Sequence, residues 1–221
     1  MLYFDSRGAP NARVPRMFAA EKGVELPTQI IDVLAAENHR APYNVEVNRT
    51  GRVPALRLDC GFILCEVLPI CEYLDEVAAG PSLIGSTSRE RAETRMWTRM
   101  IDLLYVERMT DAIKFRPSKI RDMHATYNFK TMLPAEDWSF CRDIALEKLS
   151  WIDQELKGRD FVCGDRFTLA DIHLFVFVDF FSRVDLGHSS ELTWIEDHLH
   201  RVGDRPSALA SQPTYWVARA I

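Results

Sequence analysis

A valine–proline pair followed at once by a β-hairpin and a helix is the feature that most constrains the fold of this chain. Val53-Pro54 precedes an apolar run at residues 55–58, and a second run at 62–65 follows after Asp59-Cys60-Gly61. A three-residue loop with glycine late in the turn is typical of a hairpin. Residues 67–77 then have the pattern of a helix. On its own, a valine–proline pair indicates only an extended dipeptide, so its meaning depends on these surroundings.

The segments upstream complete a recognisable order of strands and helices. Residues 2–4 predict a short strand, and residues 11–23 predict a helix that ends at Gly23. Residues 28–33 are rich in β-forming side chains, which predicts a buried parallel strand. The order β-α-β followed by β-β-α is that of a thioredoxin-like domain. Because no Cys-x-x-Cys pair follows the first strand, disulfide exchange is not the expected activity.

Glycine, proline and serine mark the end of this first domain. Residues 79–86 contain Ala79-Gly80-Pro81-Ser82 and then Gly85-Ser86, a composition typical of a linker. Every pattern after the linker is helical. We therefore predict an α/β thioredoxin-like domain over residues 1–79, a linker over 80–88 and an all-α helical domain over 89–221.

Helical spacing and one capping pattern organise the second domain. Two predicted helices carry one-sided stripes, Trp97-Ile101-Leu104-Arg108 and Ala145-Leu149-Ile152-Leu156. The sequence Thr168-Leu-Ala-Asp171 predicts a capping box that opens a third helix. We therefore interpret Asp171 as a cap rather than a catalyst, and His173, on the apolar stretch that follows, as a core residue.

Charge and cysteine content exclude several classes of protein. The net charge of −5 over 221 residues is spread without long blocks, which makes nucleic acid a poor partner. Residues 1–7 lack the pattern of a signal peptide, and the most apolar window, residues 172–181, is too short to span a bilayer, so we expect no membrane association. The five cysteines are odd in number and lack zinc-ligand spacing. They predict reduced thiols in the cytoplasm and no metal site.

Three separated segments together resemble the cytosolic glutathione transferases. Residues 9–23, beginning Ala9-Pro10-Asn11, resemble the first loop and helix of the bacterial members. Asn48-Arg49-Thr50-Gly51-Arg52-Val53-Pro54-Ala55-Leu56 resembles their N-P-x-G-x-V-P-x-L segment. Asp165-Arg166-Phe167-Thr168-Leu169-Ala170-Asp171 resembles their helix-capping signature. The resemblance covers nearly the whole chain and is closest to the bacterial and fungal branch that includes yeast-type enzymes without the usual catalytic tyrosine or serine.

This resemblance implies a glutathione site in the first domain. In the family the proline is cis, so Pro54 is expected to turn the main chain of Val53 outward, where it pairs with the cysteinyl unit of glutathione. Glu66 matches the acidic residue that holds the γ-glutamyl amine. Val67 replaces the usual serine, so only helix N–H groups remain to bind the γ-glutamyl carboxylate. The alternative interpretation of Glu66 is a carboxylate favoured by the helix dipole.

Three basic residues are candidates for binding the glycine carboxylate of glutathione. His39-Arg40 matches a basic pair with this role in some classes, and Arg52 stands where the family often has a polar or basic contact. An arginine can grip a carboxylate through two hydrogen bonds. For His39 and Arg40, a solvated polar surface is the alternative.

The catalytic donor is the position where this chain departs most from the family pattern. A transferase must stabilise the glutathione thiolate, because a free cysteine-type thiol has a pKa of roughly 8.5. Ala9 aligns with the usual serine, so that hydroxyl is absent. Asn11 matches the asparagine that some bacterial classes use to donate to the sulfur, and Ser6 is the rival donor. The alternative for Asn11 is a simple N-cap.

The resemblance as a whole implies a cytoplasmic homodimer with a role in detoxification. Its expected activity is conjugation of glutathione, the co-substrate, to a small apolar electrophile. Met109, Phe115 and Arg116 are candidates for the electrophile pocket, with a plain helix face as the alternative. Reductive dehalogenation, ether cleavage and peroxide reduction use the same thiolate. Because Ala9 and Val67 depart from the family pattern, the alternative of another class is a non-catalytic glutathione-transferase-like binding or regulatory protein.

Overall fold

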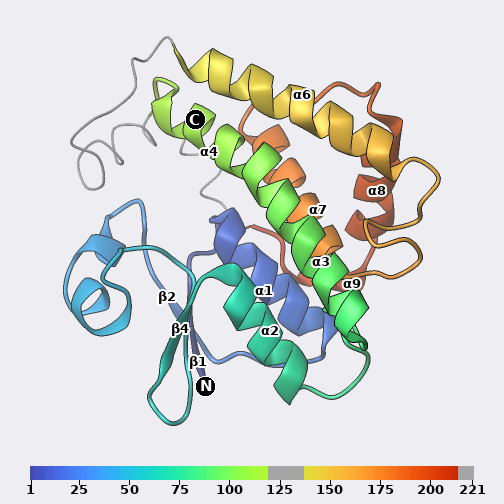
Figure 1. The fold of residues 1–221 in the computed structure, drawn as a ribbon. Coiled ribbons are helices and arrows are strands. Elements are labelled where there is room, and N and C mark those ends of the chain that lie inside the picture. The colour runs from blue at the N-terminus through green and yellow to red at the C-terminus, as the bar shows by residue number, and fades with distance from the viewer. Residues whose placement is uncertain (119–136, 214–221) are drawn as a thin grey trace. The chain divides into compact units, whose positions relative to one another are not determined.

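The computed structural model describes residues 1–118 and 137–213, which form two compact units (Figure 1). The first unit contains Met1–Ser82 and the segment that starts at Pro206. The second contains the described residues of Leu83–Arg205. The chain passes between the units at Ser82 and Leu83, inside the predicted linker. The domain boundaries 1–79 and 89–221 themselves stay a prediction.

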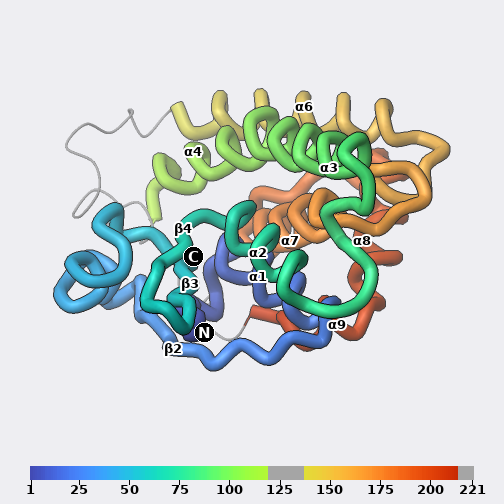
Figure 2. The backbone as a smooth tube through the Cα atoms, turned by 60° about the horizontal axis from the view of Figure 1, so that its bottom comes forward, coloured from blue at the N-terminus to red at the C-terminus, as the bar shows by residue number. Residues whose placement is uncertain are grey.

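The first unit is built on a four-stranded mixed sheet. Its strands are β1 (Leu2–Asp5), β2 (Thr28–Ile30), β3 (Ala55–Arg57) and β4 (Ile63–Cys65), in the order β2-β1-β3-β4. β1 runs parallel to β2 and antiparallel to β3, and β4 is antiparallel to β3. The helices α1 (Pro10–Glu21) and α2 (Val67–Val77) lie side by side along the sheet (Figure 2). The thioredoxin-like order predicted from the sequence is confirmed.

Alternation of side chains along β1 assigns residues to the two faces of the sheet. Tyr3 faces α1, where its hydroxyl donates to the Ala12 carbonyl at 2.7 Å. Phe4 faces the other side, where the ring of Tyr43 packs edge-on with centroids 5.8 Å apart. There Phe4 and Tyr43 form a small core with Ile31 and Ala55. The segment between β2 and β3, with its short helices η1 (Glu37–His39) and η2 (Tyr43–Val47), therefore covers this second face.

The hairpin and its following helix agree with the sequence, whereas β2 agrees only in part. The Leu58 N–H donates to the Phe62 carbonyl at 2.8 Å, and Gly61 takes a φ of 86°, which glycine adopts at little cost. For residues 28–33 the predicted parallel strand is confirmed as β2, but the predicted burial and length are wrong, because β2 covers only Thr28–Ile30 and all three of its residues are exposed. The reason is its position at the edge of the sheet.

The second unit is helical throughout its described residues, as predicted. It contains α3 (Ser88–Ile101), η3 (Asp102–Val106), α4 (Glu107–Phe115), α6 (Trp138–Leu156), α7 (Leu169–Arg183) and α8 (Thr193–Gly203). Almost every residue of α7 from Leu169 to Phe181 is buried. A helix that is apolar on all sides belongs at the centre of its domain, and α3 and α8 pack against α7.

A π-helical turn shifts the buried stripe that the sequence predicted for residues 97–108. Trp97 and Ile101 are buried as expected, but the next buried positions are Tyr105, Val106 and Met109, and Arg108 is exposed. The turn η3 is π-helical and inserts one residue, which moves the stripe by one position. The stripe predicted on α6 is confirmed, since Ala145, Leu149, Ile152 and Leu156 are all 0% exposed.

The segment after the second unit returns to α1 of the first. It forms the short helix α9 (Pro206–Ala210), in which the Ser207 hydroxyl donates to the Glu21 carboxylate at the end of α1. The side chain of Arg16 in α1 donates to the Ser211 carbonyl at 3.1 Å. Residues 206–213 therefore support the helix that opens near the candidate site.

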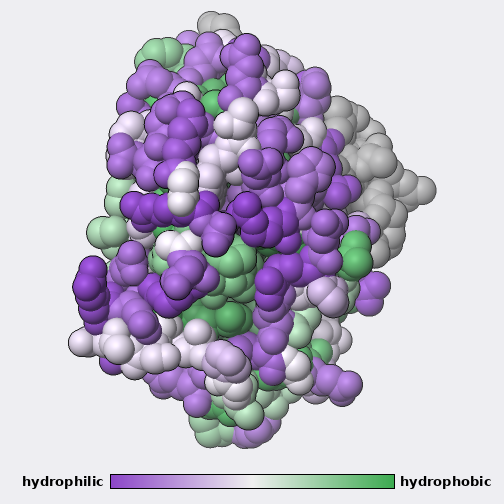
Figure 3. Space-filling view, turned by 90° about the vertical axis from the view of Figure 1, so that its right-hand side faces the viewer, coloured by the Kyte–Doolittle hydropathy of each residue, from purple (hydrophilic) through white to green (hydrophobic). Residues whose placement is uncertain are grey.

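The visible surface is mainly polar. Hydrophilic side chains cover most of the face shown in Figure 3, and hydrophobic ones are confined to smaller areas. In the described part of the chain, none of the helices combines the length and the apolar composition that crossing a bilayer requires.

Candidate functional site

Three side chains hold the two carbonyl groups that precede Val53. The bonds run from Asn38 Nδ2 to Gly51 at 2.5 Å, from Tyr43 Oη to Arg52 at 2.7 Å and from Asn48 Nδ2 to Arg52 at 2.9 Å. The Val53–Pro54 peptide bond is cis, as predicted. Within residues 1–118 and 137–213, no hydrogen bond reaches the N–H or C=O of Val53 itself. The segment is therefore held firmly up to Val53, whose own main chain remains available to a ligand.

The start of α2 provides a second set of polar groups without an internal partner among those described. Glu66 is the N-cap residue, with φ 74° and ψ 146°, and its carboxylate makes no capping hydrogen bond. A φ in this range is rare for a residue with a side chain, and such outliers gather at functional sites. The first turn contains no acidic residue. Since Pro69 has no N–H, the unpaired donors of this turn are the backbone groups of Val67 and Leu68.

The three predicted cations differ in their surroundings. Arg40 donates to the Ala35 carbonyl at 2.8 Å and is engaged within its own turn. The ring of His39 lies against Gly51, where an added Cβ would be 2.4 Å from Nδ1. Burial lowers the pKa of His39, which favours its neutral form. Arg52 is exposed, and in the described part of the chain its guanidinium has no partner.

The N-terminus of α1 is open and lies at the end of the β1–α1 loop. Ala9 is the N-cap and makes no side-chain bond, and Pro10 is the first helical residue. The alternative prediction that Asn11 is the N-cap is therefore wrong; Asn11 is exposed one position inside the helix. The first backbone N–H of the helix with a partner is that of Arg13, which bonds the Ala9 carbonyl at 3.1 Å. Ser6, by contrast, is only 4% exposed.

A partly buried ion pair fixes the loop between β1 and α1. Arg16 Nη1 lies 2.6 Å from both carboxylate oxygens of Asp5, and Nη2 donates to the Arg7 carbonyl at 3.4 Å. Burial raises the pKa of Asp5, and the charge of Arg16 opposes that shift. The two charges hold the end of β1 against α1, so the open N-terminus of α1 keeps a fixed direction.

The predicted electrophile residues lie in the packing of the second unit. Met109 is 0% exposed and Phe115 is 8% exposed. The Arg116 guanidinium donates to the Val184 carbonyl at 3.0 Å and pairs with Asp185 at 3.2 Å. This arrangement agrees with the alternative of a helix face, and a contact with an electrophile stays a prediction for all three residues.

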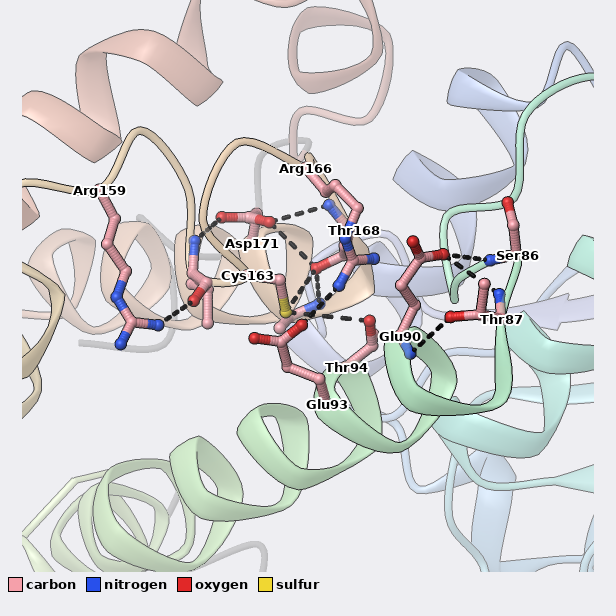
Figure 4. Close-up of polar contacts among 12 residues, drawn as sticks. Ser86, Thr87, Glu90, Glu93, Thr94, Arg159, Cys163, Arg166, Thr168 and Asp171 are labelled. Carbon is pink, nitrogen blue, oxygen red and sulfur yellow. Dashed lines mark hydrogen bonds and ion pairs between the residues drawn. The ribbon is translucent and has the colours of Figure 1, made fainter.

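Asp171 is confirmed as a cap, and it serves more partners than a capping box requires (Figure 4). One carboxylate oxygen accepts the Thr168 N–H at 2.8 Å. The other accepts the Val162 N–H at 2.8 Å and lies 3.2 Å from His198 Nε2. His173 is 3% exposed, as expected for a core residue, and pairs with Asp102 at 3.1 Å.

The described residues contain no group of three His, Cys, Asp or Glu side chains arranged to hold a metal ion.

Tyr43 is the functional candidate that the sequence did not indicate. A single tyrosine between Pro42 and Asn44 fits no motif, and its importance comes from a contact nine residues away. Asn48 belongs to a segment that the sequence did single out, but the bond from its amide to Arg52 appears only in the structure.

Comparisons with known proteins agree over both units. Residues 4–82 match the family profile described as glutathione S-transferase, N-terminal domain, and residues 107–202 match glutathione S-transferase, C-terminal domain. The chain is 27% identical over 212 residues to glutathione S-transferase 2 of Saccharomyces cerevisiae, covering 94% of this chain and 87% of the relative. It is 28% identical over 189 residues to glutathione S-transferase GstA of Escherichia coli O157:H7, covering 84% and 85%. The crystal structure of Gtt2 from Saccharomyces cerevisiae superposes with a TM-score of 0.85 at 25% identity, covering 96% of this chain and 100% of that one.

Proposed function

This chain belongs to the glutathione S-transferase family of enzymes, and we propose that it joins the thiolate of glutathione to a small apolar electrophile. The observation that carries the proposal is the available main chain of Val53, which lies two residues before Ala55; Ala55 pairs with Cys65, directly before Glu66 and the open start of α2. The main chain of Val53 suits the cysteinyl unit of glutathione, and Glu66 with the start of α2 suits the γ-glutamyl unit.

Glutathione would bind in the first unit as an added strand. The N–H and C=O of Val53 pair with the cysteinyl unit, the Glu66 carboxylate binds the γ-glutamyl amine, and the Val67 and Leu68 N–H groups bind the γ-glutamyl carboxylate. Arg52 is the main partner of the glycine carboxylate, because its charge has no internal partner among the described residues. His39 assists when protonated, and Arg40 contributes only if it leaves the Ala35 carbonyl.

The sulfur would lie near the N-terminus of α1. Asn11 donates a side-chain N–H to the thiolate, and the positive end of the helix dipole adds to its stabilisation. An amide can do this without ionising. Ser6 stays the rival donor, although its burial argues against it. The thiol proton leaves to solvent, the thiolate sulfur forms a bond to the electrophilic carbon, and the leaving group departs with its electron pair.

The remaining assignments follow from the family. We propose that Met109, Phe115 and Arg116 contribute to binding the electrophile, that the protein is a homodimer in the cytoplasm, and that it serves in detoxification. Reductive dehalogenation, ether cleavage and peroxide reduction start from the same thiolate.

The direct test is turnover of the purified chain with glutathione and a panel of aryl halides, β-aryl ethers and organic peroxides. Conjugation predicts a product whose mass is the sum of both substrates less the leaving group and one proton. Oxidation of glutathione with loss of halide or with consumption of peroxide would assign reductive dehalogenation or peroxide reduction instead, and a conjugate formed with release of an aryl alcohol would assign ether cleavage.

A second candidate is a non-catalytic glutathione-binding or regulatory protein. It is favoured by Ala9, which places no hydroxyl at the start of α1, and by Val67, which places none at the start of α2. Bound glutathione without turnover of any electrophile in the panel would support this candidate and contradict the enzymatic proposal.

A further inference from the structure

The Arg52 carbonyl is held from two sides. It accepts the Tyr43 hydroxyl at 2.7 Å and the Asn48 side-chain amide at 2.9 Å. A carbonyl oxygen has two lone pairs, so both are occupied. The other end of the Asn48 amide is fixed as well, because its oxygen accepts the Thr50 N–H at 3.0 Å and the Thr50 hydroxyl at 2.8 Å. The direction of the Arg52 C=O is therefore set by neighbouring side chains.

The same peptide unit contains the N–H of Val53. A peptide unit is planar, and in the trans form its C=O and N–H point in opposite directions. The Arg52–Val53 bond is trans, since the cis bonds of the described chain are those before Pro42 and Pro54. The groups that grip the Arg52 carbonyl therefore also fix the direction of the Val53 N–H. That N–H has no partner in residues 1–118 and 137–213.

The Tyr43 side chain is itself immobilised. It is 3% exposed and packs edge-on against Phe4 in the small core that includes Ile31 and Ala55. Burial raises the pKa of Tyr43 far above its usual value, so the hydroxyl keeps its proton and remains a donor. The Tyr43 ring thus connects Phe4 of β1 to the Arg52–Val53 peptide, since it packs on the first and its hydroxyl donates to the second.

We propose that Tyr43 is a positioning residue that directs the Val53 N–H toward the cysteinyl carbonyl of bound glutathione. The inference rests on the proposed function, because it gives the Val53 donor its ligand. Tyr43 touches neither the ligand nor the sulfur in this account. It acts only through the Arg52–Val53 peptide plane.

A matched control exists in the same unit. The Tyr3 hydroxyl also donates to a main-chain carbonyl at 2.7 Å, and Tyr3 is 1% exposed. Tyr3→Phe and Tyr43→Phe each remove one buried hydroxyl bond and keep the ring. A purely structural role predicts similar losses of thermal stability for both variants and no difference between them in ligand binding.

The experiment compares the parent, Tyr43→Phe and Tyr3→Phe by calorimetric titration with glutathione and by thermal unfolding. Loss of one hydrogen bond that fixes the donor is expected to weaken glutathione binding about five-fold in Tyr43→Phe. Binding by Tyr3→Phe should equal that of the parent. In steady-state kinetics, KM for glutathione should rise in Tyr43→Phe while kcat at saturating glutathione stays unchanged, because the thiolate donor is not altered.

Amide hydrogen exchange at Val53 gives an independent reading. Glutathione should protect this amide strongly in the parent and Tyr3→Phe, and less in Tyr43→Phe. Parent-like binding and protection in Tyr43→Phe would overturn the positioning role and leave the glutathione site intact. Equal weakening in both tyrosine variants would overturn it too, since that result indicates general loosening. A parent that does not bind glutathione would overturn the inference and the proposed function together.

Discussion

At the residue scale, the starts of α1 and α2 differ from those of α3 and α7 in one respect. The first turns of α1 and α2 contain no acidic side chain, and neither helix has a side-chain cap. α3 and α7 instead have complete capping boxes, with Glu90 and Asp171. The positive ends of α1 and α2 are thus left uncompensated, which suits a thiolate and a carboxylate.

Asn11 is the residue on which the proposed catalysis depends most. Removing its amide by Asn11→Ala should raise the apparent pKa of bound glutathione by about one to two units, the worth of one charge-assisted hydrogen bond. The pH–rate profile should move to higher pH, with slower conjugation below the new pKa and little change in glutathione affinity. If the profile moves only in Ser6→Ala, the donor is Ser6.

The contributions of His39 and Arg52 to glutathione binding should depend differently on pH. Burial lowers the pKa of His39 below its usual 6.5, so the ring is neutral at higher pH and gains its proton as the pH falls. The weakening of glutathione binding by His39→Gln should therefore be small at about pH 8 and grow toward about pH 5.5. Arg52→Gln should weaken binding by the same factor throughout, because its charge does not titrate in this range. Titration calorimetry across this interval checks both, and a pH-independent effect of His39→Gln would contradict the role of its charge.

The residue scale is also where the sequence was least informative. Family likeness gave the position of Glu66, but no side-chain preference predicts a φ of 74° for a glutamate. His39 and Arg40 are adjacent in sequence, yet Arg40 bonds the Ala35 carbonyl while His39 packs on Gly51. Which partner each of these side chains contacts depends on the path of the loop, and the local sequence pattern does not determine that path.

At the scale of elements, prediction succeeded where a local signal was strong. The hairpin loop with Gly61, the helix Val67–Val77 and the capping box of α7 were all found where expected. Burial was predicted wrongly in two places. β2 is exposed because it is an edge strand, and edge position is a property of the whole sheet. The π turn η3 shifts the buried stripe to Tyr105 and Met109, and an inserted residue leaves the helical period on either side unchanged.

The cap at the start of α7 should be the more important of the two capping boxes. Asp171 is 0% exposed and accepts the N–H groups of Thr168 and Val162. Asp171→Ala leaves both buried donors unpaired, which should lower the free energy of unfolding by ~3 kcal/mol. Glu90→Ala removes the equivalent carboxylate from the exposed box of α3 and should cost clearly less. Chemical denaturation measures both, and equal losses would show that the additional partners of Asp171 contribute nothing.

At the scale of the whole molecule, every group assigned to glutathione belongs to the first unit. The sheet supplies Val53 through the segment before β3, α1 supplies Asn11, and α2 supplies its first N–H groups. The chain returns to this unit after Arg205, and Arg16 ties the Ser211 carbonyl to α1. The second unit has its own core around α7, in which Met109 also lies. The groups that we propose for glutathione thus come from the first unit, whereas Met109, which we propose for the electrophile, lies in the second.

Calorimetric titration of the parent, Glu66→Ala and Glu76→Ala with glutathione tests the central claim most directly. Glu66 is the N-cap of α2, whereas Glu76 is an exposed carboxylate near the other end of the same helix. We expect saturable binding by the parent, equal binding by Glu76→Ala, and at least about ten-fold weaker binding by Glu66→Ala, because the γ-glutamyl amine loses its charged partner. Binding by Glu66→Ala that equals the parent, or no binding by the parent, would rule out the proposed glutathione site.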